Sequence, residues 1–326
     1  MALLEVDNLV VDIRLSDGVL HAVSGVSFSL ARGETLAIVG ESGSGKSMTS
    51  LALMNLLPKR AARRAGRLVF DGVDLVKAPE PRMRSLRGNR MAMIFQEPMT
   101  SLNPSYTIGS QLTEALRTHR AVSPAEARDR AVFLLEKVGI TGAARRLNQY
   151  PHQLSGGLRQ RVMIAMALMC GPDLIVADEP TTALDVTIQA QILHLLADLK
   201  TEFGMAMILI SHDLGVVARV ADHVAVMYAG EVVESGPARP LFHNPRHPYT
   251  RGLLNCIPVP GRTAPGSPLG AIPGQLPSPI GPRHGCAFRE RCAFAAPECA
   301  GDMANAEAAP GHRVRCVRLP AMEAAA

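Results

Sequence analysis

The glycine-rich stretch GESGSGKS, residues 40–47, has residue types and spacing that suggest phosphate chemistry. It fits the pattern G-x-x-x-x-G-K-[ST], in which glycines let backbone N–H groups curl around phosphate oxygens. A following helix would point its positive end at the same phosphates. Lys46 would supply a charge for the β- and γ-phosphates, and Ser47 a hydroxyl for Mg²⁺. A chance glycine-rich turn is the alternative. The pattern predicts a nucleotide site formed by Gly40, Glu41, Ser42, Gly43, Ser44, Gly45, Lys46 and Ser47.

A second candidate site is DLIVADEP, residues 173–180, where four apolar residues lead into two adjacent carboxylates. Sheets of α/β proteins place their ligands at the carboxyl ends of strands. Asp178 would hold Mg²⁺ through water there, and Glu179 could take a proton from an attacking water. A strand that merely ends in a solvated acidic turn is the alternative, and the phosphate-binding pattern makes that interpretation improbable.

The segments around the first stretch are predicted to form the strand and the helix that a phosphate-binding loop requires on either side. ETLAIVG (34–40) predicts a buried strand, and SMTSLALMNLL (47–57) predicts a packed helix directly after the glycines. Farther along, apolar runs alternate with helical segments, which is typical of a mostly parallel sheet. These runs are residues 174–178, 205–211 and 223–230.

Two further regions differ from this pattern. Residues from about 97 to 172 predict helices, one of them with Ser123 as N-cap, Pro124 at its first position and Gly139 at its end. The composition changes after about residue 240, and the segment IPVPGRTAPGSPLGAIPGQLPSPIGPRHG (257–285) is so rich in proline and glycine that neither helix nor strand should run through it, which indicates an extended connector.

Composition narrows the class of protein. The formal charge is only +5 and there is no tryptophan, so a nucleic-acid groove with interleaved aromatic residues is disfavoured. The N-terminus lacks a basic flank followed by an apolar run, which argues against a signal peptide. The longest apolar stretches are about half of the ~20 residues that cross a bilayer. We expect a soluble intracellular protein.

The segment QLSGGLRQR, residues 153–161, resembles the signature sequence of ATP-binding cassette (ABC) ATPases. The resemblance implies that Ser155, Gly156 and Gly157, which precede an apolar helix, face the γ-phosphate of an ATP held by the opposite subunit. Small residues and free amides at a helix N-terminus suit that role because they form an anion site.

Other elements of that family follow in the same order. Gln96 in IFQEP resembles the glutamine that senses Mg²⁺ and the attacking water, and Asp185 in TTALD resembles the aspartate of the dimer interface. His212 in LISHDL resembles the switch histidine that contacts the γ-phosphate. One position departs from the pattern: Leu15 stands about where the family stacks an aromatic ring on adenine, so base selectivity should be weaker.

Three longer stretches resemble the ATPase subunits of bacterial oligopeptide and dipeptide importers. They lie after Gln96, around the signature, and at NPRHPYTRGLL (244–254). The resemblance implies uptake of peptides driven by ATP hydrolysis at the cytoplasmic face of the inner membrane. It also implies several partners: a second ATPase subunit in a homo- or heterodimer, two transmembrane permeases, and a periplasmic or lipoprotein substrate-binding protein.

Related functions compete with this prediction. Importers of nickel, glutathione or oligosaccharides belong to the same branch. DNA-repair ATPases interrupt the cassette with a long insertion, for which the segment between Ser47 and Ser155 leaves no room. Ribosome-associated factors normally carry two cassettes on one chain, whereas this chain has a single set of motifs.

Four cysteines in the tail, spaced C-x5-C-x6-C-x16-C, predict a metal-bearing segment. A small proline- and glycine-rich segment usually needs a cross-link, and disulfides are disfavoured in the cytosol. The spacing lacks the close pairs of ordinary zinc sites, whereas four thiolates on longer loops can hold a [4Fe–4S] cluster. The importer resemblance implies the same cluster, with Zn²⁺ or reduced thiols as alternatives. The candidate ligands are Cys286, Cys292, Cys299 and Cys316.

These observations together predict an α/β fold: a P-loop core with an N-terminal antiparallel β subdomain, a helical subdomain and a small cysteine-rich C-terminal extension. We expect the ATPase domain to span residues 1–240, with the helical subdomain at about 97–170, and the extension to span 241–326.

Overall fold

The computed structural model describes residues 2–97, 101–182, 185–257, 270–277, 280–281 and 284–319. The chain forms two compact units, which we describe separately. The first contains Ala31–Glu34 and Lys77–Ile210; the second contains Ala2–Leu30, Thr35–Val76 and Ser211–Ala326. Within the described residues, no helix combines the length and the apolar character needed to cross a membrane.

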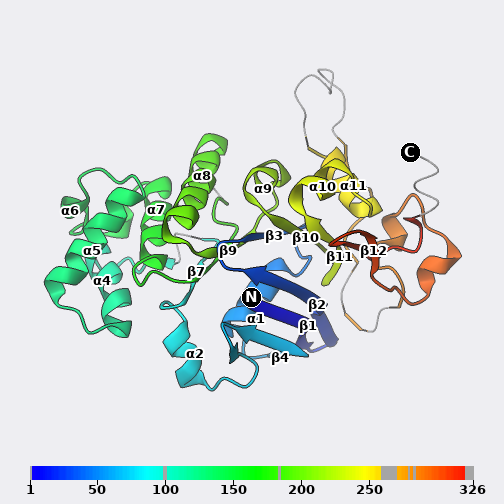
Figure 1. Ribbon diagram of the computed structural model, residues 1–326, viewed down its shortest axis with the longest axis horizontal. Coiled ribbons are helices and arrows are strands. Elements are labelled where there is room, and N and C mark those ends of the chain that lie inside the picture. The colour runs from blue at the N-terminus through cyan, green and yellow to red at the C-terminus, as the bar shows by residue number, and fades with distance from the viewer. Residues whose placement is uncertain are drawn as a thin grey trace. The chain divides into compact units, whose positions relative to one another are not determined.

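The first unit combines a parallel sheet with a group of helices (Figure 1). Strand β8 lies between β7 and β9 and is parallel to both. Every residue of β8 and β9 is buried, as expected for a parallel sheet covered on both faces. The elements are α2 (Glu80–Leu86), β7 (Met91–Ile94), α4 (Ile108–His119), α5 (Pro124–Lys137), α6 (Ala143–Arg146), η1 (Pro151–Gln153), α7 (Gly156–Ala167), β8 (Leu174–Asp178), α8 (Val186–Phe203) and β9 (Ala206–Ile210).

Helices α4, α5, α6 and α7 gather at one end of this unit (Figure 1). The N-terminus of α5 is a capping box: the Ser123 hydroxyl accepts a bond from the Glu126 N–H, and the Glu126 carboxylate accepts one from the Ser123 N–H. Pro124 opens the helix as predicted, and Gly139 follows its end with a positive φ of 76°. The predicted helical character of this region is confirmed.

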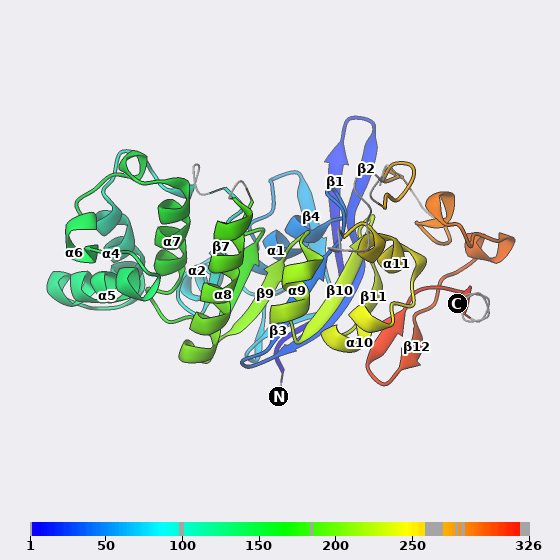
Figure 2. The same ribbon diagram turned by 90° about the horizontal axis from the view of Figure 1, so that it is seen from above.

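The second unit contains an antiparallel sheet with strand order β2-β1-β5-β6, and β4 pairs with β1 beside β5. Strands β1 and β2 form a long hairpin (Figure 2). Because the two-residue turn at 16–17 separates them, Leu15 and Gly18 face each other at its tip. The strands are β1 (Ala2–Leu15), β2 (Gly18–Ala31), β4 (Ala61–Arg64), β5 (Arg67–Phe70) and β6 (Val73–Asp74).

The rest of the second unit is built around a buried strand, β3, which is parallel to β10. Strand β10 continues in antiparallel fashion into β11, β13 and β12. The elements are β3 (Thr35–Val39), α1 (Lys46–Met54), α9 (Leu214–Val220), β10 (His223–Tyr228), β11 (Glu231–Pro237), α10 (Ala238–His243), α11 (Pro248–Asn255), η2 (Arg289–Arg291), η3 (Pro297–Ala300), β12 (Ala306–Ala309) and β13 (His312–Val314).

The cysteine-bearing tail is therefore joined to the sheet. Strand β13 places Val314 opposite Glu234 of β11, which gives the edge of β11 a hydrogen-bonding partner. His312 Nε2 lies 2.7 Å from Glu234 Oε1, and both side chains are buried. This pairing was not evident from the composition of the tail, because β12 and β13 are short and only partly apolar.

Candidate functional site

The loop between β3 and α1 has a backbone that only glycine can follow at two of its positions. Gly40 has φ 150° and Gly45 has φ 101°, a region that side-chain-bearing residues rarely adopt. A Cβ on Gly40 would lie 2.2 Å from the Met227 carbonyl oxygen, and one on Gly45 would lie 2.4 Å from that of Ala22. Gly40 and Gly45 are thus required by close contacts with neighbouring backbone.

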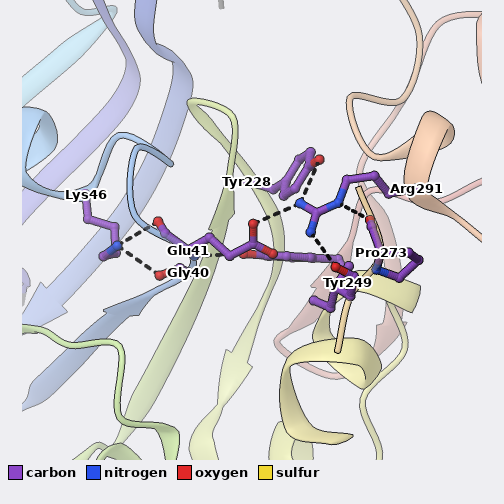
Figure 3. Close-up of polar contacts among 8 residues, drawn as sticks. Gly40, Glu41, Lys46, Tyr228, Tyr249, Pro273 and Arg291 are labelled. Atoms are coloured by element: carbon purple, nitrogen blue, oxygen red, sulfur yellow. Dashed lines mark hydrogen bonds and ion pairs between the residues drawn. The ribbon is translucent and has the colours of Figure 1, made fainter. Parts of the chain in front are cut away.

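Lys46 is the first residue of α1 and its side chain folds back over the loop. Its Nζ donates to the carbonyl oxygens of Gly40 and Glu41, each at 2.9 Å (Figure 3). Ser44 Oγ is buried and has no hydrogen-bond partner among the described residues. A helix N-terminus, a lysine ammonium and a buried hydroxyl without a partner form a donor set that fits phosphate oxygens.

The carboxylates at the end of β8 have different surroundings. Asp178 is the last residue of the strand and is only 5% exposed. Glu179 turns away from the strand with φ 44° and donates its N–H to the Ile210 carbonyl at 3.0 Å. A positive φ is costly outside glycine and typically marks a functional position. The strand geometry therefore directs these neighbouring carboxylates differently.

Gln96 and Glu179, which are far apart in the sequence, meet in the first unit. Gln96 Nε2 donates to Glu179 Oε2 at 3.0 Å. The same carboxylate oxygen accepts a bond from Thr182 Oγ1 at 2.9 Å. Sequence reasoning did not identify Thr182, although it lies in the segment between the acidic pair and Asp185. Two donors therefore orient the carboxylate that was predicted to act as a base.

The signature residues lie at the start of α7. Ser155 is the N-cap, and its hydroxyl accepts a bond from the Leu158 N–H at 3.4 Å. Ser155 and Gly156 are exposed, and Gly157 is half-buried. Asp185 is the exposed N-cap residue of α8, and no side-chain capping bond is formed there. These polar groups are accessible at the surface of the first unit.

The remaining predicted residues belong to the second unit, together with the phosphate loop. His212 is exposed and lies just before α9, whose N-cap is Asp213. Leu15 is 39% exposed at the tip of the β1–β2 hairpin. The structure thus brings Gln96 and Glu179 into contact within one unit, and holds Lys46 over the loop within the other.

Two residues that sequence reasoning did not assign to the site hold Glu41 of the loop. Tyr249 in α11 accepts a hydrogen bond from the Glu41 N–H at 2.8 Å. Arg291 forms an ion pair with the Glu41 carboxylate at 2.8 Å (Figure 3). Tyr249 lies inside NPRHPYTRGLL, so the motif marked its segment, whereas no motif marks Arg291.

The four tail cysteines are free thiols. Cys286 donates its N–H to the Cys299 carbonyl at 2.8 Å, which links the segments that carry these two residues. The Cys292 sulfur accepts a bond from the Phe294 N–H, and the Cys316 sulfur accepts one from the Arg318 N–H, each at 3.4 Å.

The thiols of this cysteine group also interact electrostatically. The pKa of Cys286 is raised to about 11, chiefly by burial; the Phe288 N–H acts in the opposite direction, and the nearby thiols of Cys299, Cys316 and Cys292 add to the rise. Within the described ranges, no group of three or more His, Cys, Asp or Glu residues is arranged so that it could hold a metal ion. The predicted metal centre is therefore not present as a preformed ion site.

Comparison with known proteins connects these features. Residues 23–182 match the ABC transporter family, and residues 233–299 match the oligopeptide/dipeptide transporter C-terminal region. A probable peptide ABC transporter ATP-binding protein of Sinorhizobium fredii is 51% identical over 97% of this chain and 95% of its own length. A putative peptide import ATP-binding protein of Brucella melitensis is 53% identical, with 91% of each chain covered.

Solved structures agree with the sequence comparison. A dimeric ATP-binding cassette in a post-hydrolysis state, bound to ADP and phosphate, is similar with a TM-score of 0.65 and 28% identity. The similarity covers 72% of this chain and 99% of that one. The glycine-rich loop, the paired carboxylates and the start of α7 all lie within the residues that match this family, and the chain belongs to the ABC transporter ATPase family, as a P-loop α/β ATPase with a C-terminal region of the oligopeptide/dipeptide transporter type.

Proposed function

We propose that this chain is the ATP-hydrolysing subunit of an importer that carries di- and oligopeptides across the bacterial inner membrane. The observation that carries the proposal is the match of residues 233–299 to the oligopeptide/dipeptide transporter C-terminal region. Relatives named as peptide import proteins support it, because their similarity extends over nearly the whole chain. The chain would act at the cytoplasmic side of the membrane, as a peripheral subunit.

The phosphate loop would hold ATP. Backbone N–H groups of residues 40–47 and the Lys46 ammonium would bind the β- and γ-phosphates, as the fit of the donor set indicates. Ser47, Gln96 and Asp178 would hold Mg²⁺, which supplies charge neutralisation on the phosphate oxygens when bound. Leu15 would contact the base without stacking on it.

Glu179 would act as the base for the attacking water. One oxygen of its carboxylate accepts hydrogen bonds from both Gln96 and Thr182, which hold the group in one orientation. Gln96 would orient that water, and His212 would contact the γ-phosphate. General bases of this kind typically contribute about 10²- to 10⁴-fold to a rate.

The second half of the composite site would come from another ATPase subunit, of the same or a related sequence. Ser155, Gly156, Gly157 and Asp185 are exposed or half-buried where they could meet it. Similar cassettes are solved as dimers, which supports this arrangement. No nucleic acid is part of the proposed function.

A groove in the first unit offers a docking place for a permease. It has a volume of ≈ 880 Å³ and runs along α4, with Asn103, Tyr106, Gln111 and His119 among its lining residues. Tyr106 is 55% exposed there. The groove belongs to the proposed helical subdomain (about 97–170) of a 1–240 ATPase domain, so movements of Gln96 on phosphate loss could be transmitted to it. Two permeases and a periplasmic or lipoprotein substrate-binding protein would complete the importer.

Reconstitution tests this function. The chain, with a partner ATPase where one is required, is assembled with its permeases and binding protein in proteoliposomes, and ATP-dependent uptake of labelled peptides is measured. Peptide uptake that disappears when Lys46→Ala replaces the wild type supports the proposal. Uptake of nickel, glutathione or oligosaccharide in place of peptide would assign the chain to another importer of the same branch.

We also propose that the cysteine group holds a [4Fe–4S] cluster. Four thiols occur in one segment, and N–H groups donate to the sulfurs of Cys292 and Cys316, which stabilises thiolates at cluster sites. Because no ion site is preformed among the described residues, cluster binding would require the thiol-bearing loops to close. Protein purified anaerobically should carry about four irons per chain and absorb near ~400 nm; colourless protein with one zinc, or with no metal, would contradict the cluster.

A further inference from the structure

One arginine joins the cysteine-bearing segment to the phosphate loop. Arg291 is the last residue of η2 and directly precedes Cys292. Its Nη1 lies 2.8 Å from Glu41 Oε2, and its side chain is only 6% exposed, against 28% for Glu41. The two residues are 250 positions apart in the chain, so this ion pair is a long-range contact within the second unit (Figure 3).

The guanidinium of Arg291 is held on several sides. Nε donates to the Pro273 carbonyl at 2.8 Å, and Nη2 donates to the Ile272 carbonyl at 3.1 Å. The guanidinium carbon also lies 5.8 Å from the Tyr228 ring centroid and 6.0 Å from that of Phe288. A planar fork with five donors can satisfy these directions together, whereas a lysine ammonium cannot. The side chain therefore has little freedom to move independently of its segment.

Glu41 in turn is connected to the residue that would hold the nucleotide. Its N–H donates to Tyr249 Oη at 2.8 Å, and its carbonyl oxygen accepts from Lys46 Nζ at 2.9 Å. The Tyr249 ring lies edge-on to Tyr228, with centroids 4.6 Å apart, so both anchors of Glu41 belong to one packed cluster. A shift of Arg291 would move Glu41 and thereby the carbonyl that positions Lys46.

We propose that Arg291 is a positioning residue for the phosphate loop, through which the state of the four-cysteine segment sets the affinity for nucleotide. The contact chain runs from Cys292 through Arg291 and Glu41 to Lys46. An ordered segment holds Arg291 against Glu41 and keeps the loop in its phosphate-binding form; a disturbed segment releases it. The inference rests on the proposed nucleotide site at residues 40–47, and it holds whichever metal, if any, the cysteines bind.

The first experiment measures ATP affinity and steady-state ATPase kinetics of the full chain. Arg291→Met keeps the apolar stem and should raise the Kd and KM for ATP about tenfold, with kcat at saturating ATP nearly unchanged, because Arg291 touches no reacting group. Arg289→Met is the matched control: Arg289 lies in the same η2 turn, and its guanidinium donates to the His284 carbonyl at 2.7 Å rather than to the phosphate loop, so this change should leave KM unchanged. Arg291→Lys keeps a charge beside Glu41 and should restore part of the affinity.

The outcomes separate this inference from a purely structural role. If Arg291→Met lowers the melting temperature but leaves the KM for ATP at the wild-type value, the positioning role is wrong. If Arg291→Lys restores nothing and Glu41→Gln leaves the KM for ATP at the wild-type value, packing rather than the ion pair is responsible, and the proposal also fails. Lys46→Ala serves as the separate check on the nucleotide site: ATP binding that survives it contradicts the site itself, independently of Arg291.

A double-mutant cycle tests the route through Glu41 and Cys292. Glu41→Gln combined with Arg291→Met should raise KM no more than the larger single change, because both remove the same ion pair. Cys292→Ser should raise KM in the wild-type background and have no further effect on KM in the Arg291→Met background. Additive effects of the cysteine and arginine changes would show that the segment acts by another route, and would overturn the coupling.

Discussion

Two helices of this protein begin at short runs of small residues, α1 after Gly45 and α7 after Ser155. The two helices differ in how the N–H groups of their first turns are capped. The α1 N-cap is a glycine with φ 101° that supplies no side-chain cap, and the lysine that follows it is 4% exposed. The α7 N-cap is an exposed serine whose own hydroxyl accepts the Leu158 N–H. No lysine or arginine occupies the first turn of α7 before Arg159.

The difference indicates two kinds of anion site. The loop before α1 brings its own cation and is held by surrounding backbone and by Arg291 and Tyr249, so it can bind phosphate within one chain. The start of α7 offers a helix N-terminus and small residues but little charge, so it is suited to complete a site whose main contacts another subunit supplies. Four predictions would break or sharpen this comparison.

The largest expected effect concerns turnover. Glu179→Gln keeps the phosphate loop intact and should leave ATP binding in place while kcat falls by about 10²- to 10⁴-fold, because the base is lost. The variant should also accumulate as a closed, ATP-bound dimer. ATP binding by equilibrium dialysis, phosphate release and sedimentation together check this. Turnover near the wild-type rate would remove Glu179 from its role.

The next effect concerns the second helix. Ser155→Arg should leave the ATP affinity of the isolated chain nearly unchanged, because the loop before α1 is complete in itself. The arginine would occupy the space intended for the γ-phosphate held by the partner, so dimer closure and hydrolysis should be lost. Nucleotide titration measures the ATP affinity, and light scattering with ATP measures dimer formation. An isolated chain that no longer binds ATP would show that α7 acts on its own chain's nucleotide.

A matched pair of alanine substitutions compares the two helix starts directly. Gly45→Ala places a Cβ where φ is 101° and the Ala22 carbonyl oxygen is 2.4 Å away, so the free energy of unfolding should fall by about 1 to 3 kcal/mol. Gly157→Ala in α7 places a Cβ 3.4 Å from Ile188 Cγ2, an ordinary contact, and helix propensity should make it neutral or slightly stabilising. Urea unfolding measures the free energy of unfolding of both variants. An equal loss in the two would contradict the difference proposed between the two helix starts.

The smallest effect concerns the base. The resemblance to the family places Leu15 about where an aromatic ring stacks on adenine, and stacking between rings is worth about 0.5 to 1.5 kcal/mol, or roughly tenfold in affinity at most. We expect GTP to compete with ATP better here than in relatives that carry a ring at this position. Competition against a fluorescent nucleotide measures it. The structure supplies one candidate for a compensating contact: Ile280 forms a bridge with Leu20 on the same hairpin. Strong ATP preference lost in Ile280→Ala would assign base recognition to it.

The local features of the site could be predicted from the sequence because they depend on neighbouring residues. Apolar runs in the sequence predicted the buried strands β3 and β8, and Ser123 and Pro124 predicted the start of α5. The phosphate loop was identified for the same reason, since its glycines, lysine and serine act within eight consecutive positions. Their roles toward nucleotide and metal stay predictions.

Contacts between distant segments could not be predicted in this way. Thr182 and Gln96 share one oxygen of Glu179, and nothing in the spacing of the three residues specifies that geometry. The tail was expected to be a small cysteine-rich extension, and nothing in its composition indicated that β13 pairs with β11. Edge pairing depends on which strand is left open once the sheet has formed, and a short, partly polar strand carries almost no periodic signal of its own.

The amino-acid order by itself determined the buried strands, the glycine-rich loop after β3 and the acidic end of β8, because each is encoded by residue type and periodicity over a few residues. The signature segment before α7 was identified by its resemblance to the family. Only the tertiary structure decided that Arg291 reaches Glu41 and that Tyr249 receives the N–H of the same residue. Those contacts require Arg291 to lie beside the loop after β3, next to the rings of Tyr228, Tyr249 and Phe288, which pack against one another. The hydrophobic effect has no preferred direction and does not depend on which segments of the chain meet. The ion pair between Arg291 and Glu41 is therefore specified only when the core has formed and brought the two segments together.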